Sequence, residues 1–148
     1  MNNYARFVIM IVVSTIAMFG LMYLNTYQPD HLFFSETRLY MAVYMGSAMA
    51  VIMLLFMIGM YESRAINMAI LLLATSIFAG SLWLVRSQQT VDDVFWMKAM
   101  IPHHSIAILT SSRARITDPR VRELADSIIE AQEREIGEMK RLIEELDK

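Results

Sequence analysis

Three long apolar runs, residues 7–24, 39–60 and 65–85, fill most of the first 86 residues of this chain. A helix needs about 20 predominantly apolar residues to cross a bilayer, and each run is close to that length. With 56% apolar and only 19% charged residues, the chain is also too apolar for an ordinary soluble domain. We therefore expect a membrane domain over residues 1–86 with three transmembrane helices, and the lipid bilayer as a partner.

The composition changes from Arg86 onward. This tail holds ten of the thirteen Lys and Arg residues and twelve of the fifteen Asp and Glu residues, with the two signs interleaved. A nucleic-acid partner is not expected, because a phosphate-binding surface needs a basic excess. The chain has no cysteine, which excludes disulfides, thiolate metal sites and thiol nucleophiles. No enzymatic activity is indicated, and any soft-metal binding must use methionine and histidine.

The tail is predicted to form a helical hairpin over residues 87–148. Its first helix is expected over residues 91–116. Asp118 and Pro119 then mark the start of a second helix that runs to about Leu146, since aspartate is a good N-cap and proline fits the first helical position. The predicted fold is therefore all-α, with three transmembrane helices followed by a C-terminal helical hairpin.

Both hairpin helices carry polar residues on their apolar faces. The second helix places these apolar side chains on one face: Val121, Leu124, Ala125, Ile128, Met139, Leu142, Ile143 and Leu146. Gln132 and Glu135 fall within about 40° of the middle of that face at ~3.6 residues per turn. The first helix gathers Asp93, Trp96, Met97, Met100, His104, Ala107 and Ser111 on one face, with His103 at its edge. A carboxylate on a buried face must be paired, protonated or bound to a metal.

Two interpretations of this polar set remain open at this point. If the two faces meet, Met100, His103 or His104 would contact Glu135 and Met139. The first interpretation is a structural module with a hydrogen-bonded histidine–glutamate core and no metal. The second is a metal site, and the combination of thioether and imidazole groups points to copper.

The second apolar run has two features with step four. One is a methionine row, Met41, Met45, Met49, Met53 and Met57, followed by Met60. Thioethers could pass Cu(I) through the bilayer along this row, or they could fill gaps at a helix contact. The other feature is Ala42, Gly46 and Ala50, the small-residue spacing that lets two membrane helices approach closely. We expect these three residues to pack helices.

Several segments of the tail resemble the domain-of-unknown-function 305 family. They are Asp93-Val-Phe-Trp-Met-Lys-Ala-Met100-Ile-Pro-His103-His104, Asp118-Pro119, Leu124-Ala125, Ile128-Ile129, Ala131-Gln132, Glu135-Ile136 and Met139. The resemblance implies a ferritin-like, four-helix-bundle type of fold and a largely bacterial, exported or membrane-attached protein. It also implies copper binding in the periplasm, which some members of the family show.

The resemblance selects a metal-facing set of Met100, His103, His104, Glu135 and Met139. Asp93, Met97, Gln132 and His31 are possible additional ligands. Family members commonly continue after the double histidine with Gly-Ala-Ile-x-Met, whereas this chain has Ser105 at the first position and Thr110 in place of the later methionine. Fewer sulfur ligands are therefore expected.

Together these features predict a membrane-anchored copper-binding protein for metal buffering or tolerance. An odd number of crossings places the hairpin on the side opposite the N-terminus, but the charges flanking the helices do not decide which side that is. The resemblance favours the bacterial inner membrane, with a cytoplasmic N-terminus and a periplasmic hairpin. Two helices make a thin bundle, so we expect a homo-oligomer, formed by two hairpins or by pairing through Ala42, Gly46 and Ala50. A copper-handling partner cannot be named.

Overall fold

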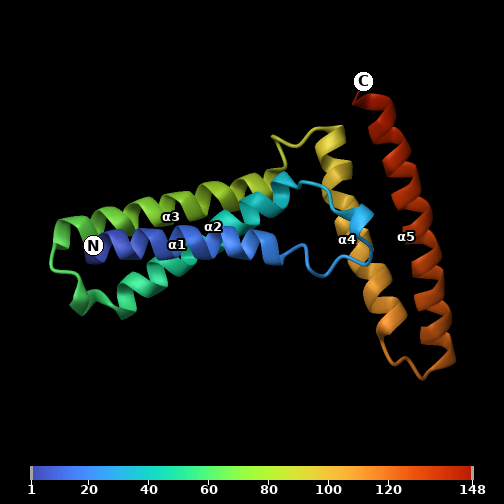
Figure 1. Cartoon of the computed structure of the whole chain (residues 1–148), viewed down its shortest axis with the longest axis horizontal. Helices are drawn as coiled ribbons and strands as arrows, with labels where there is room; N and C mark the ends of the chain where they lie inside the picture. Colours follow the sequence, from blue (N-terminus) through green and yellow to red (C-terminus); the bar gives the residue numbers. More distant parts are fainter. Residues whose placement is uncertain (1, 148) are drawn as a thin grey trace. The chain divides into compact units, whose positions relative to one another are not determined.

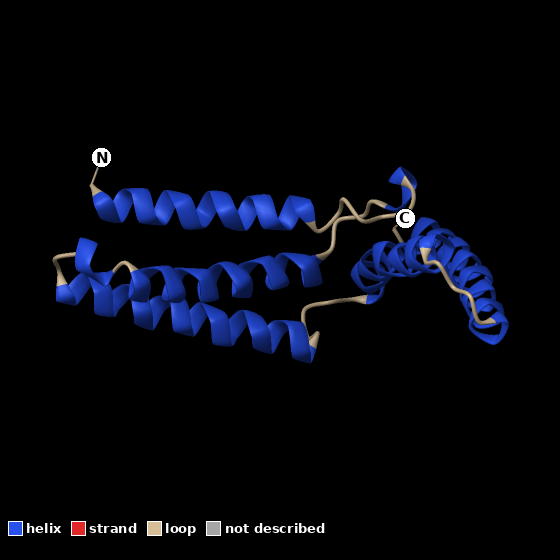
Figure 2. Ribbon diagram, turned by 90° about the horizontal axis from the view of Figure 1, so that it is seen from below, coloured by secondary structure: helices blue, strands red, loops and turns tan. Residues whose placement is uncertain are grey.

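The computed structural model describes residues 2–147, and all regular secondary structure in that part of the chain is helical (Figures 1 and 2). The α-helices are α1 (Asn3–Leu21), α2 (Glu36–Phe56), α3 (Arg64–Ser87), α4 (Asp93–Arg113) and α5 (Pro119–Leu146). Two short 3-10 helices, η1 (Pro29–His31) and η2 (Ile58–Met60), lie in the connections. The predicted all-α fold is confirmed.

The chain forms two compact units. The membrane unit comprises Met1–Met22 and Thr37–Thr90, and therefore contains α1, α2 and α3. The hairpin unit comprises Tyr23–Glu36 and Val91–Lys148, with α4 and α5. The sequence analysis assigned residues 23–36 to the membrane domain. In the structure this connection, which we call the first loop, packs with the hairpin instead.

The helices α1, α2 and α3 are each long and apolar enough to cross a membrane, as predicted from the three apolar runs. Their ends are set by local signals outside those runs. The Asn2 side chain accepts a hydrogen bond from the Tyr4 amide, and Ser63 caps α3 through the Ile66 amide. The second run ends earlier than expected, since α2 stops at Phe56 and η2 takes up its last residues.

Small residues bring α1 and α2 close together. Ala42, Gly46 and Ala50 are all buried, and a Cβ atom at position 46 would collide with the hydroxyl of Thr15 on α1. Thr15 donates its hydroxyl hydrogen to the Ile11 carbonyl one turn earlier, so it is fixed in place. The small-residue row therefore packs against α1 of the same chain.

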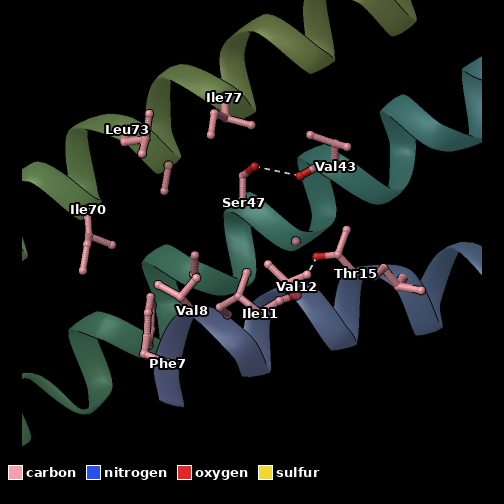
Figure 3. A pocket seen from close by; sticks show the side chains of 14 residues that line it. Phe7, Val8, Ile11, Val12, Thr15, Val43, Ser47, Ile70, Leu73 and Ile77 are labelled. Carbon is pink, nitrogen blue, oxygen red and sulfur yellow. Dashed lines mark hydrogen bonds between the residues drawn. The ribbon is translucent and has the colours of Figure 1, made fainter. Parts of the chain in front are cut away.

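An apolar groove of about 390 Å³ lies between α1, α2 and α3 (Figure 3). The Ser47 hydroxyl on its wall donates to the Val43 carbonyl at 2.7 Å, so the groove offers no free donor there. Met53 and Met57 pack against the buried cluster of the membrane unit, and Met45 and Met49 are half-buried. These positions agree with a packing role for the methionine row.

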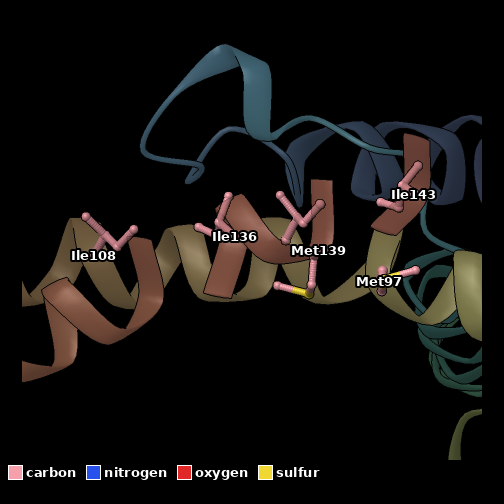
Figure 4. Packing of buried hydrophobic residues seen from close by; sticks show 6 residues of the cluster. Met97, Ile108, Ile136, Met139 and Ile143 are labelled. Atoms are coloured by element: carbon pink, nitrogen blue, oxygen red, sulfur yellow. The ribbon is translucent and has the colours of Figure 1, made fainter. Parts of the chain in front are cut away.

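The helices α4 and α5 form an antiparallel hairpin with one apolar core (Figure 4). Its buried residues are Met97, Ile101, Ile108, Ile136, Met139 and Ile143. As predicted, Asp118 caps α5 by accepting from the Arg120 amide, with Pro119 in the first turn. Asp92 caps α4 through the Phe95 amide, a start signal that the sequence analysis did not use.

The buried face of α5 is rotated from the predicted one. Ile136 is buried, whereas several members of the predicted face are exposed: Val121, Leu124, Ile128, Leu142 and Leu146. The α4 core consists of Met97, Ile101 and Ile108, and Trp96 is 51% exposed. The predicted face left out Ile136, and the single partner helix α4 covers only one edge of the predicted apolar stripe.

We predict that Gly46→Ala destabilises the membrane unit. The added methyl group meets the β-branched Thr15 side chain, and such overpacking costs about 1–3 kcal/mol. Thermal unfolding in detergent measures the change. Gly80→Ala is the matched control, because a Cβ at that helical position meets nothing within 4 Å. Adding Thr15→Ala should restore part of the lost stability, and a Gly46→Ala protein as stable as wild type contradicts the prediction.

Candidate metal site

The structure brings His104 and Glu135 together at one edge of the hairpin. The Nδ1 atom of His104 lies 3.1 Å from Oε2 of Glu135. His104 Nδ1 is itself buried, and within residues 2–147 it has no assigned hydrogen-bond partner. An imidazole nitrogen and a carboxylate oxygen thus face each other at the edge of the hairpin.

Burial favours the neutral form of the His104 imidazole. Burial lowers the pKa of His104 below its ordinary value of 6.5, the Glu135 carboxylate opposes this shift, and His103 adds to it. A neutral imidazole is the form that ligates metals. The pair is therefore a potential nitrogen and oxygen donor set rather than a charged ion pair.

Three methionine side chains lie in or against the adjoining core. Met97 and Met139 are buried members of the hairpin core, and both are visible in Figure 4. Met100 is half-buried and packs against the same cluster, one helical turn before His104. Met139 follows Glu135 by one turn on α5. Sulfur donors thus lie on the turns next to the His104–Glu135 pair.

The other predicted ligands are less closely placed. His103 is exposed, and its ring centre lies 6.4 Å from that of His104. Asp93 is exposed in the first turn of α4, and Gln132 is half-buried. Within the described residues, no group of three or more His, Asp and Glu side chains is close enough to hold a metal ion. Among these predicted ligands, the structure brings one histidine and one carboxylate, His104 and Glu135, within 3.1 Å of each other.

His31 lies on the other side of the hairpin. It is only 6% exposed, and its Nδ1 atom lies 2.9 Å from the Ser105 hydroxyl oxygen. A cavity of about 240 Å³ beside it is lined by Glu133, Gly137 and Lys140 of α5. At about 100° per residue these positions are roughly opposite Glu135. His31 is therefore directed away from the His104–Glu135 pair.

The first loop is tethered to the hairpin by residues that the sequence analysis did not recognise. The Ser105 hydroxyl oxygen, which is fully buried, accepts a hydrogen bond from the Tyr27 amide at 2.7 Å. Lys140 donates to the Asp30 carboxylate at 2.6 Å. Ser105 was the sequence signal for this tether. The family that the chain resembles commonly has glycine at this position, and a serine hydroxyl in a helix core requires a hydrogen-bond partner.

Comparison with known proteins identifies the hairpin. The family model described as "Domain of unknown function (DUF305)" matches residues 84–148, which include α4 and α5. A relative from Acanthamoeba polyphaga mimivirus, "Uncharacterized protein L153", is 32% identical over 143 residues, or 92% of each chain. The chain belongs to the DUF305 family. The similarity to the viral relative extends over both units, and no solved structure matches the chain.

We predict that stability of this DUF305 hairpin falls as the pH drops from 7.5 to 5.5. Burial is the largest cause that lowers the pKa of His31 below 6.5, the Lys140 charge adds to the shift, and Asp30 and Glu133 oppose it. His31 therefore favours the folded state above pH 6.5, and this contribution is lost as the pH falls, because the unfolded chain takes up the proton more readily.

Unfolding measured in detergent at the two pH values tests this prediction. His31→Gln should lower stability at pH 7.5 by about 0.5–1.5 kcal/mol, as expected for one hydrogen bond. It should also reduce the loss between the two pH values. An equal loss in wild type and variant contradicts the assignment to His31.

Proposed function

We propose that the chain is a membrane-anchored copper-binding protein that serves metal buffering or tolerance. The observation that carries the proposal is the buried Nδ1 atom of His104, which lies 3.1 Å from Glu135 and has no assigned hydrogen-bond partner. A buried ring nitrogen without a hydrogen-bond partner is costly. A cation that contacts this nitrogen and the Glu135 carboxylate removes the cost.

The residues around this pair fit copper. Imidazole nitrogen suits several transition metals, and nearby thioether sulfur favours Cu(I) over harder ions. His104 and Glu135 would hold the ion together with Met100, and Met139 lies one turn from Glu135. His103 is a further donor on the exposed side. Copper would supply no catalytic step in this proposal, which concerns storage and delivery of the ion.

The hairpin is proposed to work in the periplasm of a bacterial inner membrane. Three crossings of the membrane would put the hairpin on the side opposite the N-terminus, and the resemblance to exported copper-binding proteins supports the periplasmic side. Access to copper on that side would be direct, because His103 is exposed and the side chain of Glu135 is 44% exposed.

A second candidate function is a structural oligomerisation module with no metal. The exposed apolar side of α5 favours it, since Leu124 is 60% and Leu146 57% exposed. In that case His104 and Glu135 would form a hydrogen-bonded pair after a small side-chain rotation. Metal content of the purified protein separates the two functions.

We predict that His104→Ala and Glu135→Gln each weaken copper binding by at least about tenfold. Loss of an outer-shell partner already weakens metal binding about tenfold, and these two residues are proposed to contact the ion directly. His103→Ala combined with His104→Ala should abolish binding at this site. Competition titrations with Cu(I) and Cu(II) chelators measure the affinity. His31→Gln is the histidine control and should bind as wild type does. Unchanged affinity in the double variant rules out this site.

Replacing Met45, Met49 and Met53 by leucine should leave copper binding and copper tolerance of cells unchanged. Leucine has a similar volume, and such swaps usually cost less than about 1.5 kcal/mol. Growth at graded copper concentrations and chelator titration provide the two measurements. Loss of tolerance with intact binding would support the alternative in which the methionine row conducts Cu(I).

A further inference from the structure

One side of the hairpin is apolar and uncovered. The exposed apolar residues of α5 are Val121, Leu124, Ile128, Leu142 and Leu146. At about 100° per residue they fall within one sector roughly 60° wide, and Glu135 lies in the same sector. We call these five residues the α5 stripe. Large exposed apolar patches usually mark an interaction site.

The first loop covers the opposite side. It reaches α5 at Lys140 and contacts the cavity walls at Glu133 and Gly137, about 160–200° around the helix from Glu135. The hairpin thus has one side closed by its own chain and one side with the α5 stripe and the candidate metal residues.

The α5 stripe is self-complementary when two copies lie antiparallel. A two-fold axis that crosses α5 near residue 133 places Leu124 of one copy opposite Leu142 of the second copy. It also places Val121 opposite Leu146. In a two-fold symmetric interface, a residue of the first copy contacts a second residue on the other copy, and the same pair of contacts occurs with the copies exchanged.

The charges near the two ends of α5 also favour antiparallel docking. At about 100° per residue, Arg120 borders the α5 stripe at the start of the helix, and Glu138 and Glu145 border it toward the end. All three side chains are exposed, and a two-fold axis near residue 133 places Arg120 of one copy beside Glu145 of the other. Antiparallel copies bring the basic end of one helix to the acidic end of the other, which favours association.

These features favour a second copy over a lipid surface as the occupant. A helix that lies on a membrane carries Lys and Arg beside its apolar face. Glu135 instead lies in the same sector as the α5 stripe, whose C-terminal half is bordered by Glu138 and Glu145. A carboxylate at the centre is unfavourable against acyl chains but acceptable where imidazoles and a cation meet it.

The candidate metal residues lie at mid-height of both helices. The middle of α4 is residue 103, and Glu135 is two residues from the proposed axis on α5. With a rise of about 1.5 Å per residue, the two Glu135 positions are offset by only about 6 Å along the helix direction. Dimerisation therefore brings two incomplete sites to the same place.

We propose that a second copy of the chain docks antiparallel on the α5 stripe, so that His104 and Glu135 of both copies form one shared copper site at the two-fold axis. The shared site rests on the proposed copper function, whereas the docking does not. The arrangement supplies the donors that a single hairpin lacks, and it gives the exposed His103 a position at the edge of the interface.

Engineered cysteines test the docking in the full-length chain, which has no cysteine of its own. Leu124→Cys combined with Leu142→Cys should give a disulfide-linked dimer under mild oxidation. Each single variant should stay monomeric on a denaturing gel, because two copies of one position are about 27 Å apart along the helix. That separation is far beyond the roughly 4.4–6.8 Å between Cα atoms of a disulfide.

The matched control is Glu123→Cys combined with Arg141→Cys, which has nearly the same spacing on an exposed side away from the α5 stripe. It should not cross-link. Cross-linking of Leu124→Cys alone indicates parallel copies and overturns the proposal. So does a double variant that remains monomeric while its cysteines react with a thiol reagent.

Copper stoichiometry separates the docking from the function. The wild type should bind one ion per two chains. Leu124→Arg should prevent the docking, which light scattering of the detergent-solubilised protein measures as a monomer, and it should weaken copper binding at least about tenfold, since half of the donors are removed. A cross-linking protein that holds no copper refutes the proposed function and leaves the docking intact. Full copper affinity in a monomeric Leu124→Arg protein refutes the shared site and leaves the copper function intact.

Discussion

The packing of α4 on α5 determines the position of every candidate functional group in the hairpin. Ile101 and Ile108 are at most 1% exposed, and they meet Ile136 and Ile143 in the core. Burying a side chain of this size contributes about 1.5–3 kcal/mol, so the four isoleucines fix the rotation of each helix. That rotation places His104 beside Glu135 and leaves His103 exposed to solvent.

Consecutive residues of α4 consequently serve opposite sides of the hairpin. His104 faces the edge where Glu135 lies, and Ser105, about 100° further around the helix, faces the first loop. The Ser105 hydroxyl is held by the Tyr27 amide and by His31, so the two histidines have separate roles. His31 fastens the loop, whereas His104 is available to a ligand.

The sequence predicted the elements of the fold well because their signals are local. Three apolar runs, the Asp118 cap and Pro119 identify helices without knowledge of any contact. Rotation of α5 was predicted less well, since an apolar sector wide enough for two partners does not reveal which part faces the first one. The pairing of His104 with Glu135 followed from helix periodicity. The tether of His31 to Ser105 did not, because the two residues are 74 positions apart and a serine in the family pattern does not reveal which residue its hydroxyl contacts.

The smallest fragment that contains all the packing partners of the DUF305 hairpin includes the first loop. The family match starts at residue 84, yet the loop that covers Ser105 comes from residues 23–36. An excised fragment that begins after α3 would expose a buried hydroxyl and leave the Lys140 ammonium without its carboxylate. The two units are therefore interleaved along the polypeptide. A gene truncated between α3 and α4 would encode the hairpin helices without the first loop that packs on them.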